Sequence, residues 1–376
     1  MKNYMIVNAK IVTPKEVINN GCVLIKDGII DCIEECSKSY VRSNTTVFDA
    51  KGKWLLPGIV DLHNGAINKE LEPRNNIFTP LKMAFFSLEN RLLLHGITST
   101  YHSMEFSEET SDAKQMDKTI SNIKGINNFK RYGLLRHFIN VRCDITGKKF
   151  CPKLMDMVDS KTLNLISLFD NSNRSNKIEI ANNENGNDST VVDFIDLLVD
   201  KAKKHHIPIA SIYDDSFEKI AIMKSKGVTI SEFPIDFNMA EAAVKENQYV
   251  VTGAANIVNE ESADGDINTI DAVKKGIVNV LCSDYVPSSI IHAIFILHYK
   301  HGVKIHDAVN MATINPAKAA GIDESFGSIE HGKHADLILV GDRIPFVDQM
   351  FINGKRVLCM ERNNLLNKQL WATGWA

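Results

Sequence analysis

Short apolar runs alternate with helix-like stretches through the middle of the chain, from about residue 53 to residue 326. Runs of this kind are typical of buried strands. The strand candidates are GIVDLH (58–63), ITSTYHS (97–103), HFINVRC (137–143), LNLISLFD (163–170), IPIASIYD (207–214), VTISEFP (228–234), YVVTGAA (249–255) and VNVLCSDY (278–285). Segments with helical periodicity, such as FEKIAIMKSKG, separate them. Repeated β–α units of this number predict an α/β fold whose parallel sheet closes into a (β/α)8 TIM-type barrel.

Both ends of the chain have a different texture, with short alternating runs and turn residues between them. VNAKIV and TTVFDA lie near the N-terminus, and HADLILVGD and VDQMFINGKRVLCM lie near the C-terminus. The Asn353-Gly354 pair between two apolar runs is a strong hairpin signal. We therefore expect a small β-sandwich domain built from both termini, residues 1–52 plus 327–376, beside a barrel domain of residues 53–326.

Composition narrows the class of protein. A length of 376 residues suits a barrel of about 250 residues with a smaller attachment. The net charge of −3 shows no basic excess, so we expect neither a nucleic-acid nor a membrane partner. The apolar runs are too short for a membrane span, and the N-terminus is typical of a strand rather than a signal peptide. The 7 cysteines include no CxxC pair, which favours thiols in a reducing cytoplasm.

Active sites of such barrels form at the carboxyl ends of the strands. An Asn-rich stretch without periodicity, residues 171–190, follows the fourth predicted strand on this face. We interpret it as a mobile loop, with an active-site lid and an inert loop as open alternatives. The polar residues that end the strands are Asp61, His63, Asn64, His102, Glu105, Arg142, Cys143, Asp144, Asp170, Asn171, Tyr213, Asp214, Asp215, Glu232, Asn256, Ser283, Asp284 and Tyr285.

Several segments resemble a known superfamily. LLPGIVDLH (55–63), INPAKAAGI (314–322) and GSIEHGKHADLILV (327–340) resemble the amidohydrolase superfamily. EPRNNIFTP, GVTISEFP, GAANIVN and CSDYVPSSI are similar to its PhnM family of phosphonate metabolism, diphosphatases that act on α-D-ribose 1-methylphosphonate 5-triphosphate. The resemblance implies hydrolysis in which a divalent ion activates water, His and carboxylate side chains bind that ion, and a last-strand carboxylate takes the proton from the water.

The chain departs from the family pattern where the metal ligands lie. The first-strand motif, His-x-Asp or His-x-His in the family, is His63-Asn64-Gly65. Asn171 stands where relatives have a His, and the segment 210–215 (ASIYDD) lacks the family's His. NEESADGD (259–266) replaces a loop rich in Gly, Ser and His. The last-strand carboxylate, Asp284, is retained.

The remaining residues predict an altered site. His63 and Asp284 are the catalytic candidates, facing each other from the first and last strands. With Asp214 and Glu232 they are also the candidate ligands of one divalent ion (Zn, Mn, Mg or Fe) that is weakly held or absent, because catalytic sites usually need three protein ligands. For Asp214 with Asp215 we favour a helix N-cap instead. Glu232 either lines the pore or forms an ion pair, and a structural role is favoured for His102.

Arg74, Arg142 and Tyr285 are the candidate substrate-binding residues, since a guanidinium group suits phosphate. The expected partner is a small-molecule substrate, which can be phosphorylated. A homodimer is left open, because barrels of this kind often pair. Three functions compete: a PhnM-like hydrolase with an altered metal site, a non-catalytic descendant that binds a ligand or partner, and a metal-independent enzyme with His63 and Asp284 as an acid/base pair.

Overall fold

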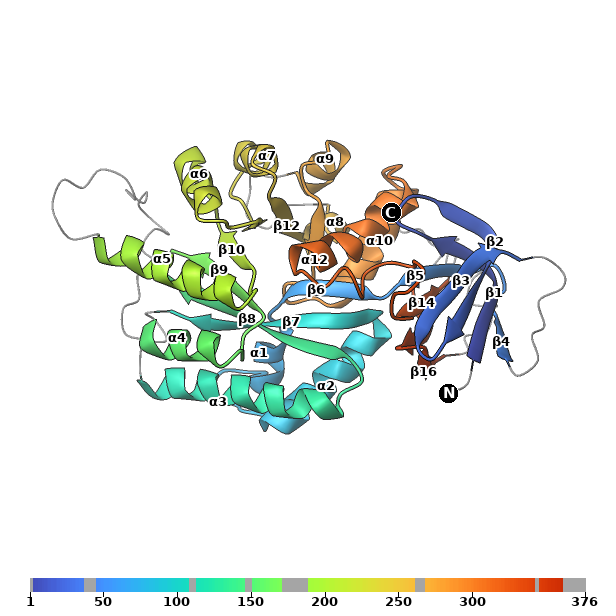
Figure 1. Ribbon diagram of the computed structural model, residues 1–376, viewed down its shortest axis with the longest axis horizontal. Helices are drawn as coiled ribbons and strands as arrows, with labels where there is room; N and C mark the ends of the chain where they lie inside the picture. Colours follow the sequence, from blue (N-terminus) through green and yellow to red (C-terminus); the bar gives the residue numbers. More distant parts are fainter. Residues whose placement is uncertain are drawn as a thin grey trace.

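The computed structural model describes residues 3–36, 45–107, 113–145, 151–170, 189–260, 268–341 and 345–360. Two sheets lie side by side, a parallel barrel and a mixed sheet made of the two ends of the chain (Figure 1). The barrel strands run in sequence order around the sheet, each hydrogen-bonded in parallel to the next. They are β6 (Ile59–Asn64), β7 (Ile97–Phe106), β8 (Arg136–Asp144), β9 (Leu165–Phe169), β10 (Ile209–Ile212), β11 (Ile230–Glu232), β12 (Tyr249–Gly253) and β13 (Val280–Cys282). All the predicted barrel strands are confirmed.

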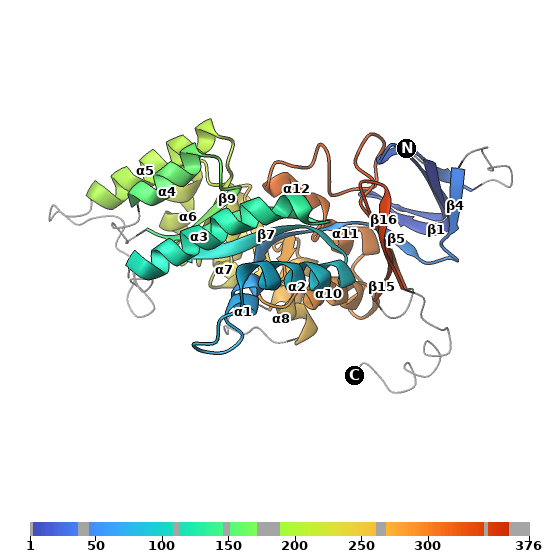
Figure 2. The same ribbon diagram turned by 90° about the horizontal axis from the view of Figure 1, so that it is seen from below.

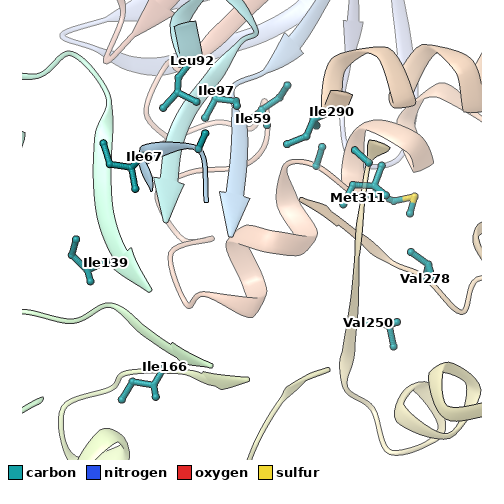
Figure 3. Packing of buried hydrophobic residues seen from close by; sticks show 14 of the residues in the cluster. Ile59, Ile67, Leu92, Ile97, Ile139, Ile166, Val250, Val278, Ile290 and Met311 are labelled. Carbon is teal, nitrogen blue, oxygen red and sulfur yellow. The ribbon is translucent and has the colours of Figure 1, made fainter. Parts of the chain in front are cut away.

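The barrel strands are buried on both faces, which explains their nearly continuous apolar runs. One face of each strand packs against the outer helices, as Ile59, Ile139 and Ile166 do (Figure 3). The other face fills the barrel with Val60, Leu62 and other residues of a separate cluster. Side chains alternate between these two clusters along a strand, as the twofold period of an extended chain requires.

Helices follow the strands and cover the outside of the barrel (Figures 1 and 2). They are α1 (Ala66–Leu71), α2 (Leu81–Leu94), α3 (Ala113–Phe129), α4 (Cys151–Asp159), α5 (Ser189–Lys204), α6 (Phe217–Ser225), α7 (Phe237–Lys245), α8 (Ala255–Val258), α9 (Thr269–Lys274), α10 (Ser288–Tyr299), α11 (Ile305–Asn310) and α12 (Ile314–Ala319), with a 3-10 turn at Lys130–Tyr132. In the described part of the chain, none of these helices could span a membrane. Residues 171–188 of the Asn-rich stretch lie outside the described residues, so the loop expected there stays a prediction.

The barrel is nearly closed. Its first and last strands, β6 and β13, meet through one parallel bridge between Asn64 and Asp284. The Asp284 N–H donates to the His63 carbonyl at 3.0 Å, and the Gly65 N–H donates to the Asp284 carbonyl at 2.6 Å. The seam therefore lies where the first and last strand ends carry the predicted site residues.

The strands of the two termini share one mixed sheet, so the expectation of a composite terminal domain is confirmed. Its order is β16-β15-β14-β5-β1-β2-β3, and β4 also pairs with β1. These strands are β1 (Asn3–Val12), β2 (Val17–Lys26), β3 (Ile29–Glu35), β4 (Thr45–Asp49), β5 (Trp54–Pro57), β14 (Leu337–Val340), β15 (Val347–Ile352) and β16 (Lys355–Cys359). The sheet has its own apolar core, with residues from both ends of the chain. The domain boundary expected after residue 52 stays a prediction. Strand β5, which begins at Trp54, still belongs to the terminal sheet.

The predicted hairpin at Asn353-Gly354 is confirmed. It joins β15 to β16, which pair antiparallel from Ile352 and Lys355 outward. Both turn residues have positive φ, 47° at Asn353 and 69° at Gly354. Two consecutive left-handed residues define the tight turn that matches strand twist, which is why this residue pair marks it.

Candidate active site

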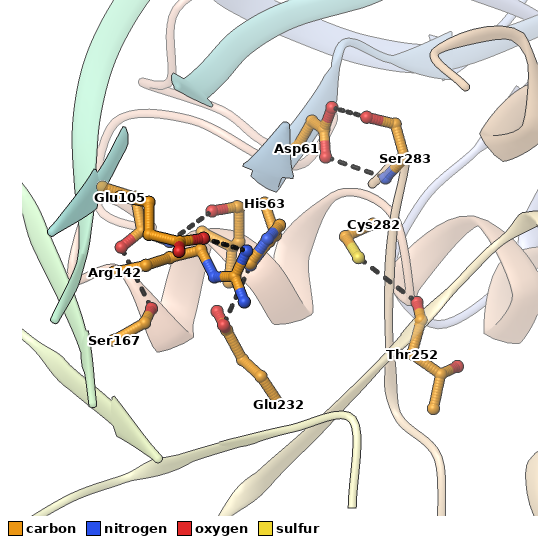
Figure 4. A network of polar contacts seen from close by, with 11 residues as sticks. Asp61, His63, Glu105, Arg142, Ser167, Glu232, Thr252, Cys282 and Ser283 are labelled. Carbon is orange, nitrogen blue, oxygen red and sulfur yellow. Dashed lines mark hydrogen bonds and ion pairs between the residues drawn. The ribbon is translucent and has the colours of Figure 1, made fainter. Parts of the chain in front are cut away.

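A buried histidine–glutamate pair lies at the carboxyl ends of the barrel strands. The His63 Nδ1 atom is 2.9 Å from Oε2 of Glu232, and both side chains are buried (Figure 4). Oε1 of Glu232 is buried and has no hydrogen-bond partner among the described residues. The Phe233 ring packs edge-on against the imidazole, with centroids 5.2 Å apart. A buried carboxylate oxygen without a partner is costly, so this oxygen marks a place where a ligand group or a water can bind.

The strand pattern explains how this pair forms. On β11, Ile230 belongs to the cluster inside the barrel, and Glu232 lies two residues further along the same face. On β6, the pairing with β7 shifts between Asp61 and Asn64, which alters the strand around His63. Since β6 and β11 are not neighbours in the sheet, the His63–Glu232 contact crosses the barrel interior.

Three residues at the same strand ends have a left-handed backbone. Tyr213, Phe233 and Asp284 follow β10, β11 and β13, and their φ values are 55°, 53° and 54°. A left-handed conformation costs a non-glycine residue on the order of 1–3 kcal/mol, and such residues cluster at functional sites. The strain supports this end of the barrel as the functional one.

Asp284 lies beside His63 along the backbone, as expected for the first and last strands of a closed barrel. Burial raises the pKa of the neighbouring Tyr285 phenol, and the Asp284 carboxylate raises it further. Burial likewise raises the pKa of the Cys282 thiol, with Asp61, Asp284 and Glu232 adding to the effect. Carboxylates therefore surround this corner of the site, and the imidazole of His63 pairs with the carboxylate of Glu232.

The third residue of the first-strand motif, Gly65, is in contact with Tyr285. A Cβ atom at Gly65 would lie 2.5 Å from Cε1 of the Tyr285 ring, closer than real side chains approach. The Tyr285 ring, which is 48% exposed, thus occupies the space of the acidic or histidine side chain that the family motif places here. The sequence shows that the expected ligand is missing at Gly65. The structure shows that the Tyr285 ring lies in the place of its side chain.

Asp61 links the two strands at the seam. Its Oδ1 accepts from the Ser283 backbone N–H at 3.0 Å, and its Oδ2 accepts from the Ser283 hydroxyl at 2.6 Å and from the Asn64 amide at 2.8 Å (Figure 4). Burial raises the pKa of Asp61 to about 6, against the effect of these hydrogen bonds. Both carboxylate oxygens are therefore committed to holding β6 against the end of β13.

We expect the Asp61→Ala substitution to destabilise the protein by about 1–3 kcal/mol or more, because it leaves buried donors of Ser283 and Asn64 without an acceptor. Urea unfolding measures the change. Asp61→Asn, which keeps one acceptor, should lose less, and Asp156→Ala on the exposed side of α4 serves as the control. Equal unfolding free energies for Asp61→Ala and Asp156→Ala would contradict this role for Asp61.

Asp214 belongs to a different network. Its oxygens accept from the Ser211 and Ser231 hydroxyls, both at 2.5 Å, and Lys219 Nζ lies 3.5 Å from Oδ1. Lys219 also donates to the carbonyls of Ile212 and Tyr213. Asp214 therefore anchors the start of α6 to β10 and β11, and its oxygens are already hydrogen-bonded.

The favoured N-cap at Asp214-Asp215 is wrong. The N-cap of α6 is Ser216, whose hydroxyl accepts from the Lys219 N–H. Serine is as good a cap as aspartate, so propensity alone could not choose between adjacent residues.

His102, for which the sequence favours a structural role, is 2.9 Å from His137 in a buried network that includes Glu89.

Of the three predicted substrate-binding residues, the structure brings two together. Arg142 donates to Glu105 at 3.2 Å, and its guanidinium lies 5.2 Å from the centroid of the Phe169 ring. The Nε atom of Arg142 is buried and has no partner among the described residues. Arg142 is close enough to Tyr285 to oppose the rise in the phenol's pKa. Arg74 lies in an exposed turn after α1, with no described contact to these residues.

The sequence did not single out Phe233 or the role of Glu105. Phe233 fixes the imidazole of His63 from the side, and Glu105 orients Arg142 from the neighbouring strand. The register Glu105↔Arg142 on β7 and β8 could have indicated the second contact, since oppositely charged residues opposite each other in a sheet interact. No pattern in the sequence indicates the contact between Phe233 and His63.

The donor set does not fit the metal that the superfamily resemblance implies. Within the described residues, no group of three His, Cys, Asp or Glu side chains converges in a way that could hold an ion. His63 is bonded to Glu232, Asp214 to two serines, and the Gly65 position is covered by Tyr285. Asn171, which stands at another ligand position, lies outside the described residues. The described side chains are therefore not arranged to bind the implied ion.

The fold is that of an amidohydrolase-type barrel, and comparison with known proteins agrees. A model of the amidohydrolase family matches residues 176–357. N-acetylglucosamine-6-phosphate deacetylase from Pasteurella multocida superposes with a TM-score of 0.70 at 15% identity, covering 95% of this chain and 100% of the other. Molinate hydrolase superposes with a TM-score of 0.69 at 14% identity, covering 95% and 94%. These similarities show the fold.

A curated relative extends over nearly the whole sequence. The chain is 26% identical to the α-D-ribose 1-methylphosphonate 5-triphosphate diphosphatase of Escherichia coli (strain K12), over 93% of this chain and 99% of that protein. The chain is thus similar to the amidohydrolase family over residues 176–357 and distantly similar to this diphosphatase over nearly its whole length, and it has the amidohydrolase fold.

Proposed function

We propose that this protein hydrolyses a small phosphorylated or phosphonate molecule at the carboxyl end of its barrel, with a depleted metal site and with His63 as the general base. The hydrogen bond between buried His63 and buried Glu232 carries the proposal. A carboxylate that accepts the Nδ1 proton leaves Nε2 as the unprotonated nitrogen and stabilises the imidazolium that forms. Glu232 is thus the residue that fixes the tautomer of His63.

The chemistry follows from these positions. Nε2 of His63 takes a proton from water as the water oxygen attacks the phosphoryl group, and His63 then returns the proton to the leaving oxygen. Arg142, with its unpartnered Nε donor, and the Tyr285 hydroxyl bind the anionic oxygens. Burial, and after it the Asp284 carboxylate, raise the pKa of Tyr285, so the phenol is a hydrogen-bond donor at neutral pH.

The relative over the whole chain supports the substrate class. That relative is a diphosphatase of α-D-ribose 1-methylphosphonate 5-triphosphate. For this chain we propose only the same class of substrate, a small molecule with a charged phosphorus group. The Nε donor of Arg142 and the Oε1 acceptor of Glu232, which have no partner within the described ranges, are complementary to a ligand that carries both phosphoryl oxygens and hydroxyl groups.

A second candidate, ligand binding without catalysis, is favoured by the donor set, because the ligands that the family resemblance implies are missing at Gly65, at Asn171 and in the segment 210–215. The two candidates differ in one measurement. A binding protein would be stabilised by phosphorylated ligands in thermal unfolding and would release no product.

The test is turnover by metal-depleted protein. After chelation and elemental analysis, phosphate and pyrophosphate release is measured from α-D-ribose 1-methylphosphonate 5-triphosphate and from simple sugar phosphates. We expect turnover at far less than stoichiometric metal, with no increase on adding Mn²⁺ or Zn²⁺. Turnover that appears only with added metal would refute the role of His63 as a metal-independent base. Thermal stabilisation without turnover would establish the binding alternative.

A further inference from the structure

Three of the cysteines lie together on one face of the terminal sheet, far along the chain from the active-site residues. Cys22 is on β2, Cys32 is on β3, and Cys36 follows β3 directly. Cys22 is buried with Met5 and Leu24, and Cys32 and Cys36 pack against this cluster. The three are reduced thiols in the structure.

The strand register explains why they meet. In the antiparallel pair β2–β3, Cys22 lies opposite Glu34, and Leu24 lies opposite Cys32. Residues two apart on a strand share a face, so Cys32 and Cys36 are the two diagonal neighbours of Cys22. The Cys36 N–H donates to the Asn20 carbonyl at 2.9 Å, which continues the pairing beyond the end of β3 and fixes Cys36 beside Cys22.

The two diagonals are not equivalent, because strand twist brings one of them closer. Cys36 lies within hydrogen-bonding reach of the Cys22 thiol and raises its pKa more than Cys32 does. Burial raises the pKa of Cys22 to about 12, and Cys36, Glu34 and Cys32 add to the rise. Cys22 is buried, whereas Cys36, like Cys32, is partly exposed and within reach of an oxidant.

We propose that Cys22 and Cys36 form a peroxide-sensitive redox pair, in which Cys36 is oxidised by hydrogen peroxide and Cys22 resolves it to a disulfide. The Cys36 thiolate attacks peroxide, so that an S–O bond forms, the O–O bond breaks and hydroxide leaves, taking a proton to become water. The Cys22 sulfur then attacks the sulfenic acid, so that the S–S bond forms, the S–OH bond breaks and a second water leaves with the Cys22 proton. Peroxide is reduced and the two thiols are oxidised.

The experiment uses the full chain, treated with hydrogen peroxide, alkylated and digested with trypsin. Cleavage at lysines places Cys22 in the peptide 16–26 and both Cys32 and Cys36 in the peptide 27–38. We expect these peptides to be cross-linked with a loss of about 2 Da relative to the reduced pair, and separated again by dithiothreitol. The cross-link should persist in Cys32→Ser and disappear in Cys22→Ala and Cys36→Ser.

Two controls keep the outcome clear. Cys359→Ser removes an exposed thiol elsewhere in the sheet and should leave the cross-link unchanged. Thermal unfolding of each variant shows that it is folded before oxidation, and Cys36→Ala replaces any Cys36→Ser protein that is not. A cross-link that persists in Cys36→Ser, a bond between Cys32 and Cys36, or sulfinic acid at Cys36 in native protein without any cross-link would each overturn the pairing.

Discussion

Replacing Glu232 with glutamine should lower kcat by about 10²–10⁴-fold while the fold remains intact, the size of effect that general-base catalysis contributes. A glutamine keeps the shape of the side chain, but it cannot stabilise an imidazolium as a carboxylate does. Because Glu232 acts through His63, a positioning role should lower kcat with little change in KM.

The matched control is Glu218→Gln, an exposed glutamate on α6 with the same change of charge. The double variant His63→Gln/Glu232→Gln should be scarcely slower than either single variant, since residues that act as a unit are not additive. Unchanged kcat in Glu232→Gln, with measurable turnover in the parent protein, would remove the pair from the mechanism.

Glu89→Ala should lower the free energy of unfolding by about 3–5 kcal/mol, the cost of leaving a buried, hydrogen-bonded ionic network without one partner. Glu89 lies on α2 and is 4% exposed. Its Oε1 accepts from the N–H groups of Leu134 and Leu135 at 2.6 and 3.1 Å and lies 3.2 Å from Nε2 of His137. One carboxylate therefore holds α2, the start of β8 and a buried histidine pair together.

The effect should depend on pH. Burial alone would raise the pKa of Glu89, but His137 and the two backbone donors outweigh it, and the net result is a lowered pKa. A carboxyl group with a lowered folded-state pKa contributes stability above its unfolded pKa, about 4.3, and loses it as the pH falls through the folded pKa. The gap between parent and Glu89→Gln in denaturant unfolding should therefore narrow in acid.

Asn90→Ala is the control, because it changes an exposed neighbour on the same helix. It should shift the unfolding free energy by a few tenths of a kcal/mol, within the usual range of surface substitutions. If Glu89→Ala were no more destabilising than Asn90→Ala, the network around His137 would not contribute to the free energy of unfolding.

The fold could be predicted because its determinants are local. Each barrel strand is a short apolar run, and the Asn353-Gly354 turn is specified by two adjacent residues. The order of strands then follows from the chain itself, since consecutive β–α units place each strand beside the previous one. Burial on both faces left a signal that was easy to detect in every strand.

The site could be predicted only as a set of candidates. His63 and Glu232 are visible as polar residues at strand ends, but their contact joins strands that are not neighbours and depends on closure of the barrel. The role of Asp214 depends on the left-handed backbone at Tyr213, which no residue pattern indicates. At Gly65, the Tyr285 ring lies where the family's ligand would be, and these two residues are at opposite ends of the barrel sequence. Such contacts are tertiary, and periodicity does not encode them.

The pairing of β5 with β14 has a consequence for synthesis of the chain. Leu56 on β5 lies opposite Ile338 on β14, so a strand made early finds its neighbour only after the whole barrel has been translated. The core of the terminal sheet likewise waits for Leu337, Leu339 and Phe351. Domains generally fold in order as they leave the ribosome, but here the first segment to emerge is among the last to be completed. Loss of the final strands would therefore expose the protein's beginning as well as its end.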